Sequence, residues 1–160
     1  MQRTIFRDGF LALISAATAV AATGCESDGG TTIEKESSPA SGSNESALVI
    51  NMGDYYFEPA NGTANSGPTK IEAVNLGKVE HELVVFKTEM NPAELPTGSD
   101  GAVEEEKMDK IAESAGEVPD VEAGVTKSAD FNLKPGKYAI FCNLPGHYAQ
   151  GMYGSLTVGK

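Results

Sequence analysis

The chain has 160 residues, enough for one ordinary domain with short appendages and too few for a large enzyme with several centres. Its formal net charge of −11 would repel phosphate backbones, so the composition argues against nucleic-acid binding. Only two cysteines and two histidines are present, so any metal site or nucleophilic pair must draw on Cys25, His81, Cys142 and His147.

Residues 1–24 have the layout of a secretory signal peptide. Arg3 and Arg7 precede an apolar run over residues 10–22, and small residues follow it. A helix over this run would span about 20 Å, short of the ~30 Å hydrocarbon core of a bilayer, which disfavours a transmembrane helix. The sequence therefore predicts export.

The segment that ends at Cys25 resembles a bacterial lipoprotein signal, in which cleavage before the cysteine leaves it lipid-modified at the new N-terminus. Ordinary cleavage after residues 19–21 is the alternative, and it would leave Cys25 as a free thiol. Residues 25–46 are rich in Ser, Gly, Thr and Glu, a composition typical of a flexible acidic linker. We therefore expect the protein to be lipid-anchored to a bacterial membrane through Cys25, facing the periplasm or the cell exterior.

Residues 47–160 carry the strand signals of one folded domain. Runs with alternating β-branched or aromatic residues are separated by turns that contain Gly or Pro. The predicted strands are 47–52, 70–75, 82–86, 128–133, 138–142 and 154–158, and the predicted turns are 61–62, 66–68, 76–78 and 134–137. This spacing indicates an all-β fold, an antiparallel β-sandwich or barrel.

Residues 88–126 interrupt the strand pattern. Within them, the acidic block 102–112 places Val103, Met108 and Ile111 close to one helical face, which predicts a short surface helix in an insertion between strands. The acidic residues could dock a basic partner, but a run of charges is most often a solvated face, and we favour that interpretation.

The residues that could bind a metal ion are concentrated at the end of the predicted strand 138–142 and directly after it. Cys142, His147 and Met152 follow one another with four residues between each pair. Sulfur ligands select copper over magnesium or calcium, and a His-Cys-His set with a weak axial Met is typical of one-electron copper sites. His81 is the other histidine, and a Greek-key sandwich could bring it beside the end of the Cys142 strand. The pattern predicts a copper site.

Each of these residues also has an ordinary structural interpretation. A single Met is usually core, a buried Cys is a small hydrophobe, and a single His is more often hydrogen-bonded than metal-bound. An unpaired thiol in an exported protein, however, calls for an explanation. A disulfide between Cys25 and Cys142 is disfavoured by the linker between them. A Cys–His catalytic pair shows no orienting partner and leaves Met152 without a role.

Residues 138–158 resemble the ligand loop and last strand of the blue-copper cupredoxins, near azurin and still nearer auracyanin. The four residues between His147 and Met152 match auracyanin-like members, whereas azurin has three. Residues 74–85 are similar to the segment that carries the first His ligand. The predicted insertion falls where azurin carries a flap outside its sandwich.

The resemblance implies a Greek-key β-sandwich with a short helical insertion and a mononuclear type 1 copper. Its ligands would be His81, Cys142 and His147 in a plane, with Met152 as the distant axial ligand. One departure concerns the residue after the first His, commonly an Asn that ties the two ligand segments together. Here it is Glu82, which changes the hydrogen bonding expected around the site.

By the same resemblance, the protein is expected to be a membrane-tethered one-electron carrier that cycles Cu(I) and Cu(II), and not an enzyme. Redox partner proteins would dock on an apolar patch around His147 formed by Leu144, Pro145 and Tyr148. The acidic domain favours a partner with a basic face. The alternative is an extracytoplasmic protein for copper storage or delivery, but the chain lacks the Met- or His-rich cluster typical of such proteins.

Overall fold

A computed structural model describes residues 47–160 of the chain. The predicted signal peptide, the linker and Cys25 lie outside the described residues, so their assignment stays a prediction. Among the described residues, no helix has the length and apolar character needed to cross a bilayer.

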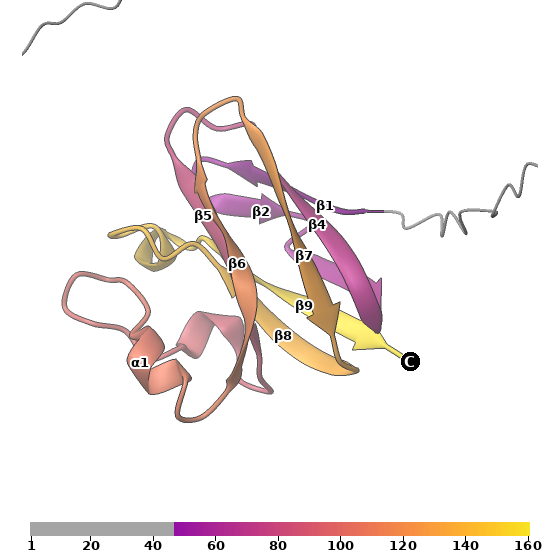
Figure 1. Ribbon diagram of the computed structural model, residues 1–160. Coiled ribbons are helices and arrows are strands. Elements are labelled where there is room, and N and C mark those ends of the chain that lie inside the picture. Colours follow the sequence, from indigo (N-terminus) through magenta and orange to yellow (C-terminus); the bar gives the residue numbers. More distant parts are fainter. Residues whose placement is uncertain (1–46) are drawn as a thin grey trace, which may run out of the picture. The chain divides into compact units, whose positions relative to one another are not determined.

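The described residues form a two-layered β-sandwich, which confirms the predicted fold class (Figure 1). One sheet has the strand order β2-β1-β4-β7 and the other β3-β9-β8-β5-β6. The strands are β1 (Leu48–Gly53), β2 (Tyr56–Glu58), β3 (Asn61–Asn65), β4 (Gly67–Asn75), β5 (His81–Lys87), β6 (Glu113–Val121), β7 (Thr126–Leu133), β8 (Gly136–Phe141) and β9 (Tyr153–Gly159).

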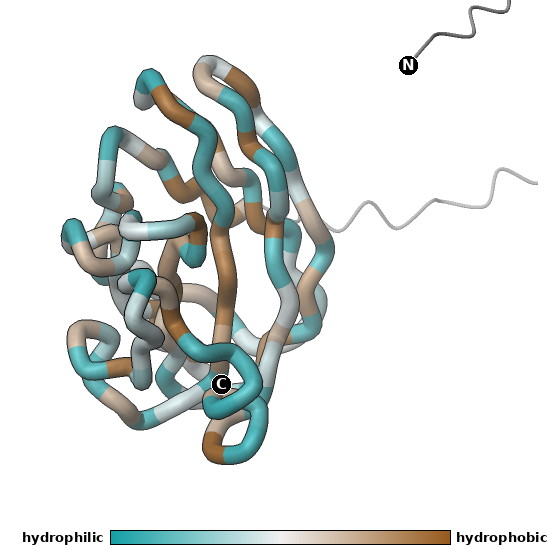
Figure 2. The backbone as a smooth tube through the Cα atoms, turned by 90° about the vertical axis from the view of Figure 1, so that its left-hand side faces the viewer, coloured by the Kyte–Doolittle hydropathy of each residue, from teal (hydrophilic) through white to brown (hydrophobic). Residues whose placement is uncertain are grey.

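The core between the sheets is built by buried residues that alternate with more exposed ones along the strands. Figure 2 shows hydrophobic and hydrophilic segments alternating along the backbone. In β4, Ile71 and Ala73 are buried while the residues between them are more exposed, and Leu156 and Val158 do the same in β9. Burying one such aliphatic side chain stabilises the fold by about 1.5–3 kcal/mol. This alternation fixes the register of the strands and therefore the direction in which the strand ends present their side chains.

The six predicted strands are all present, with ends that shift by at most three residues, but three further strands were missed. The predicted turn at Asn61-Gly62 is wrong, because these residues open β3, a polar edge strand. β6 was not predicted because it contains Gly116 and Pro119, which weaken the strand signal. A strand tolerates these residues mainly at a sheet edge, where β6 lies.

The expectation of a purely antiparallel sandwich also needs correction. β1 pairs with β4 and β3 pairs with β9 in parallel, whereas the other pairs are antiparallel. The short strands β2 and β3 connect β1 to the second sheet, so the chain changes sheets early and meets β9 in the parallel direction.

The insertion is shorter than predicted, because β6 pairs with β5 and returns the chain to the sheet. We use the term insertion for residues 88–112. Its helices are a 3-10 turn, η1 (Pro92–Glu94), and a short helix, α1 (Glu105–Met108), instead of one helix across 102–112. Met108 is buried as the helical pattern predicts, but Ile111 is 61% exposed, because the chain turns there toward β6.

A second apolar cluster fastens the insertion to the outer face of the sheet that contains β5 and β8. The sheet contributes side chains such as Phe86 and Phe141, which stack with ring centroids 6.0 Å apart. The insertion contributes Leu95, Val103 and Met108, all buried. The insertion is therefore a packed part of the domain.

Candidate metal centre

The strand pairing brings His81 and Cys142 to the same end of the sandwich. His81 is the first residue of β5, and Cys142 follows the last residue of β8. These two strands are antiparallel neighbours with Val84 opposite Phe141, so the start of one lies beside the end of the other. We use the term ligand loop for residues 142–152, which connect β8 to β9 and carry His147 and Met152.

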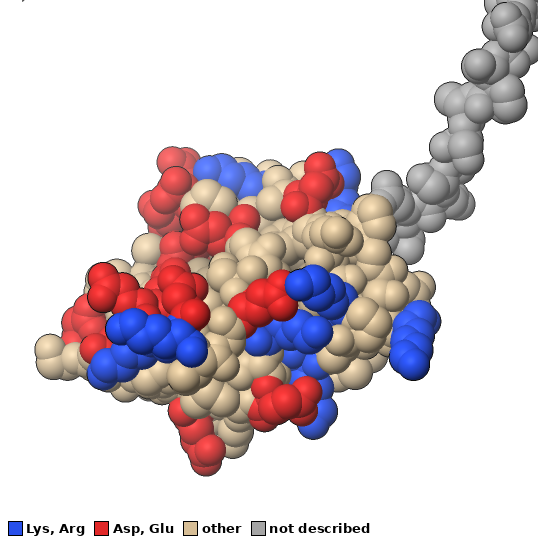
Figure 3. Space-filling model, turned by 60° about the horizontal axis from the view of Figure 1, so that its bottom comes forward, with Lys and Arg blue, Asp and Glu red and all other residues tan. Residues whose placement is uncertain are grey.

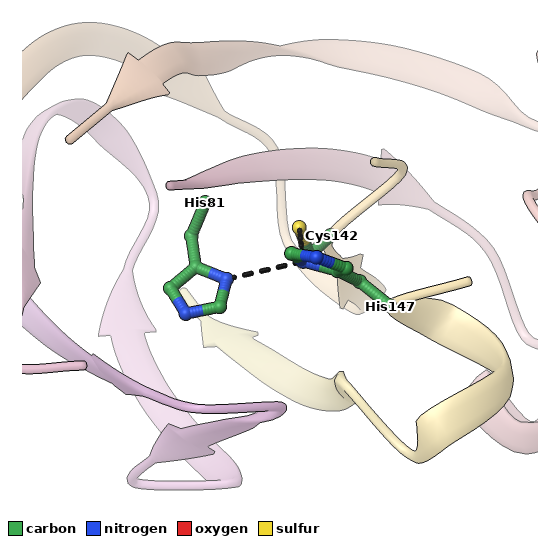
Figure 4. Close-up of side chains that lie close together, drawn as sticks. All are labelled: His81, Cys142 and His147. Carbon is green, nitrogen blue, oxygen red and sulfur yellow. Dashed lines mark hydrogen bonds between the residues drawn. The ribbon is translucent and has the colours of Figure 1, made fainter. Parts of the chain in front are cut away.

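Three side chains converge at this end (Figure 4). The Nδ1 atoms of His81 and His147 are 3.2 Å apart, and the Sγ atom of Cys142 is 3.3 Å from His147 Nδ1. One ligand atom from each residue lies within 4.8 Å of the others. The structure thus assembles two imidazoles and a thiol that are 61 and five positions apart in the sequence.

These residues fit a single copper ion. Donor atoms that share one ion lie about 3–4 Å apart, since bonds from N or S to a first-row metal are about 2.0–2.3 Å long. The observed separations of 3.2 and 3.3 Å agree with that requirement. Two borderline nitrogen donors and one soft sulfur donor are the chemistry that copper selects. Among the described residues, this is the group of His, Cys and acidic side chains able to hold a metal ion.

Burial and charge set the protonation of the three side chains. Burial lowers the pKa of His81, the neighbouring His147 lowers it further, and Asp54 raises it. Burial also lowers the pKa of His147. Both imidazoles are therefore biased toward the neutral form that binds metals. Burial raises the pKa of the Cys142 thiol to about 11, which disfavours a free thiolate at neutral pH and so argues against a Cys–His catalytic pair.

Access to the site is uneven. His81 and Cys142 are 0% exposed, whereas His147 is half-buried. His81 Nε2 is also buried and lacks a hydrogen-bond partner among the described residues. His147 is consequently the side chain of the three through which the site reaches the surface.

Met152 is fully buried at the end of the ligand loop. Its backbone carbonyl accepts a hydrogen bond from Cys142 N at 3.1 Å, and its backbone N–H donates to the His147 carbonyl at 3.2 Å. These bonds close the ligand loop and hold the backbone of Met152 beside the backbones of Cys142 and His147. Its role as axial ligand stays a prediction.

Glu82 ties the two ligand segments together, the role that an Asn commonly has in azurin-like proteins. Its carboxylate accepts a hydrogen bond from the backbone N–H of Asn143 at 2.9 Å, and its own N–H points at Cys142 Sγ, 3.5 Å away. Burial raises the pKa of Glu82, the bond from Asn143 lowers it, and Glu117, Glu105 and Asp120 raise it.

Two residues around the site were missed by sequence reasoning. Asn75 is fully buried and donates to the carbonyls of Val79 and Val121 at 2.7 and 2.8 Å, which fixes the loop that leads to His81. Tyr55 has a left-handed φ of 69° and places its ring edge-on against His147, with centroids 5.0 Å apart. Asn75 falls in the segment that resembled the first-ligand region, but no sequence signal marks Tyr55.

The predicted docking patch needs a correction at Tyr148. This side chain is only 5% exposed and turns inward, because its ring belongs to the second apolar cluster. Pro145 is exposed, and Leu144 is half-buried against the core. Tyr148 therefore cannot contribute to a surface that a partner contacts.

Comparison with known proteins gives one family match. A family model described as copper binding proteins of the plastocyanin/azurin family matches residues 44–159. No curated protein matches the chain significantly.

Solved structures share the fold at low sequence identity. Auracyanin from Roseiflexus castenholzii is 21% identical with a TM-score of 0.54, and the match covers 71% of this chain and 97% of that chain. An azurin from Methylomonas sp. strain J is 18% identical with a TM-score of 0.52, covering 71% and 98%. Auracyanin A from Chloroflexus aurantiacus, titled a "blue" copper protein, is 22% identical with a TM-score of 0.50, covering 71% and 100%.

Proposed function

Because the chain belongs to the plastocyanin/azurin family of copper-binding proteins, we propose that it is a membrane-tethered one-electron carrier. The proposed ligands of its single type 1 copper are His81, Cys142, His147 and Met152. The observation that carries this proposal is the convergence of two imidazoles and one thiol within 4.8 Å at one end of the sandwich. A bound copper would supply a Cu(I)/Cu(II) couple at this position.

The chain's own residues favour electron transfer over copper delivery. His81 and Cys142 are fully buried, and both are held by the ends of paired strands. Releasing an ion to a partner requires ligands that a partner can reach, whereas an electron can pass through the half-buried His147. A rigid ligand set also needs little rearrangement when the charge of the site changes.

Exposed apolar side chains on the two segments that carry the proposed ligands suit a short-lived apolar contact. Pro145 is exposed on the ligand loop, and Leu76 and Val79 are exposed on the loop that leads to His81. Weak redox encounters typically use small interfaces of this kind. This patch replaces the predicted one, which included the buried Tyr148.

Charge would steer the partner. Glu105, Glu117 and Asp120 lie close enough to Glu82, which follows His81, for their charges to raise the pKa of Glu82. Figure 3 shows the bottom of the domain, where lysines lie among acidic side chains. Exposed pairs such as Lys134 with Glu113 join the two kinds of charge. A partner with a basic face would therefore be attracted toward the metal end.

The proposed tether is compatible with this arrangement. β1 runs parallel to β4, whose last residue, Asn75, precedes the loop to His81. Leu48 therefore starts β1 away from the metal centre.

Copper binding tests the proposed function directly. Addition of Cu(II) to the metal-free protein should give one bound ion, an intense blue absorption and an EPR spectrum with a narrow hyperfine splitting. These signatures require a short bond from copper to the Cys142 thiolate. A colourless protein with the EPR spectrum of ordinary tetragonal Cu(II) would overturn the proposal.

The role of Met152 can be separated from its packing. Met152→Leu should keep the blue colour and raise the reduction potential, because it removes a weak donor that favours the oxidised ion. Met52→Leu is the matched control, since Met52 is equally buried in the same core cluster. Equal potentials in the two variants, measured by voltammetry, would exclude Met152 as a ligand.

Lipid attachment predicts a specific mature N-terminus. Mass spectrometry of the protein purified from membranes should show a chain that begins at a lipid-modified Cys25. Cys25→Ala should move the protein into the soluble fraction. An unmodified chain that begins at residue 22 would instead support ordinary signal cleavage.

A further inference from the structure

Cys142 and His147 are each followed by a residue whose side chain forms hydrogen bonds with the insertion. The first is Asn143, directly after Cys142. Its side-chain Oδ1 accepts a hydrogen bond from Val103 N at 2.6 Å, and its Nδ2 donates to the Val103 carbonyl at 3.1 Å. The same Nδ2 donates to the Glu105 carboxylate at 2.7 Å. Asn143 thus pairs with the backbone of the insertion as a neighbouring strand would.

The second residue is Tyr148, directly after His147. Its hydroxyl donates to the Pro92 carbonyl at 2.8 Å and accepts a hydrogen bond from the buried backbone N–H of Leu95 at 3.0 Å. Its ring packs edge-on against Phe141 with centroids 6.2 Å apart. The hydroxyl therefore connects the ligand loop to the 3-10 turn of the insertion by two hydrogen bonds. The packing of the ring does not depend on these two bonds.

A third contact lies between these two. Gly101, at φ +77°, comes so close to the ligand loop that an added Cβ would stand 3.0 Å from the Cβ of Ala149 and 3.7 Å from the Cα of Gly146. The insertion therefore lies against the middle of the ligand loop as well as against both of its anchoring residues.

The ligand loop has backbone hydrogen bonds of its own, but most of them join residues within 146–152. Its backbone bonds include His147 N to the Leu144 carbonyl at 3.0 Å and Gln150 N to the Gly146 carbonyl at 3.2 Å. Gly146 and Gly151 both have positive φ, and glycine increases the number of conformations open to a free loop. Contacts from outside the loop therefore act together with these bonds to select the observed conformation.

We propose that the insertion is a brace that holds the ligand loop in its metal-binding conformation, with Asn143 and Tyr148 as positioning residues. The functional role of this brace rests on the proposed copper site, but its restraint of the ligand loop does not require a bound metal. It assigns a role to residues 88–112, which the ligand set alone leaves unexplained.

Hydrogen exchange on the metal-free full-length protein tests the brace. In Tyr148→Phe and Asn143→Ala, the loop amides of His147, Gln150 and Met152 should exchange about tenfold faster or more, the equivalent of about 1.4 kcal/mol. The β8 and β9 amides should keep their rates within about twofold, because the ring of Tyr148 and the sandwich core remain in place.

The chain offers matched controls for both changes. Tyr138 is also buried, and its hydroxyl donates to the Lys134 carbonyl and accepts from Lys134 N, so Tyr138→Phe removes an equivalent pair of bonds away from the ligand loop. Asn61 in the edge strand β3 accepts a hydrogen bond from the Ser155 hydroxyl at 2.6 Å, so Asn61→Ala is a control for Asn143→Ala that lies outside both the insertion and the ligand loop. Neither control should accelerate exchange in the ligand loop.

A spectroscopic readout links the brace to the metal. In the copper-loaded protein, Tyr148→Phe and Asn143→Ala should change the EPR hyperfine splitting and the reduction potential, whereas Tyr138→Phe and Asn61→Ala should leave both at the wild-type values. A purely structural role would lower overall stability without this selectivity.

The outcomes are distinct. Selective acceleration in the ligand loop supports the brace, even if the wild-type protein fails to turn blue and the proposed function falls. Unchanged loop exchange, or acceleration that is equal in the loop and in β8–β9, overturns the brace whatever the copper spectrum shows. Equal effects of Tyr148→Phe and Tyr138→Phe on the loop amides would overturn it as well.

Discussion

Replacing Cys142 with serine should abolish the blue colour completely and broaden the EPR hyperfine splitting of any Cu(II) that still binds. Cys142 is the only cysteine within residues 47–160, and its sulfur lies 3.3 Å from His147 Nδ1. A hydroxyl of similar shape can still accept the hydrogen bond from Glu82 N, but it is a harder and much weaker donor to copper. The absorption spectrum after copper addition measures this loss.

Two further measurements make this result specific. The metal-free Cys142→Ser protein should retain a cooperative unfolding transition, with stability lowered by about 1–3 kcal/mol for a hydroxyl placed in a buried position. Cu(II) that binds Cys142→Ser with an unchanged blue spectrum would show that the colour arises elsewhere, and would contradict the assignment of the site to the end of β8.

The position of the candidate metal centre was predictable because the ligand spacing and the strand order both place the candidate ligands at the same end of the sandwich. Cys142, His147 and Met152 share one loop, so a strand followed by a tight turn already places them together. His81 required a tertiary argument, namely that its strand lies next to the Cys142 strand, and the pairing of β5 with β8 meets this requirement. Because the chain has two histidines, His81 was the one further histidine that could be proposed as a ligand.

The strands that were missed lack a local signal. Asn61-Gly62 has the chemistry of a turn, and β3 forms because β9 offers an open edge at that point. β6 carries Gly116 and Pro119, and it is held by β5 despite two irregularities of register. In both cases pairing with a distant strand overrides the local preference of the sequence.

The misassigned residue of the site shows the same limit. An aromatic residue in a loop with Pro145 and Gly146 was interpreted as part of a surface patch, but the Tyr148 ring fills the second apolar cluster. Its hydrogen-bond partners, Pro92 and Leu95, lie more than 50 positions away, and the partners of Asn143 lie about 40 away. Neither contact can be derived from a spacing within the ligand loop.

Truncating Phe141 should destabilise the fold more than any single substitution of a metal-centre residue. Phe141 is fully buried, stacks on Phe86 and meets Tyr148 edge-on, so Phe141→Ala opens a cavity between the sheet and the insertion. We expect a loss of about 3–5 kcal/mol in the free energy of unfolding, measured by urea denaturation. Ile111→Ala is the control, because Ile111 is 61% exposed and its truncation should change stability by less than about 0.5 kcal/mol.

This experiment must be made on the metal-free protein first. A ligand present at about a thousand times its Kd stabilises the folded state by about 4 kcal/mol, which is as large as the expected loss and would mask it.

Comparison with the copper-loaded protein then separates two roles of Phe141. An equal loss in both forms means that Phe141 supports the fold alone. A larger loss in the loaded form means that the residue before Cys142 also supports the binding of copper, because the cavity then weakens metal affinity as well as packing. A loss below about 1 kcal/mol in the metal-free form would contradict the packing of the insertion on β8.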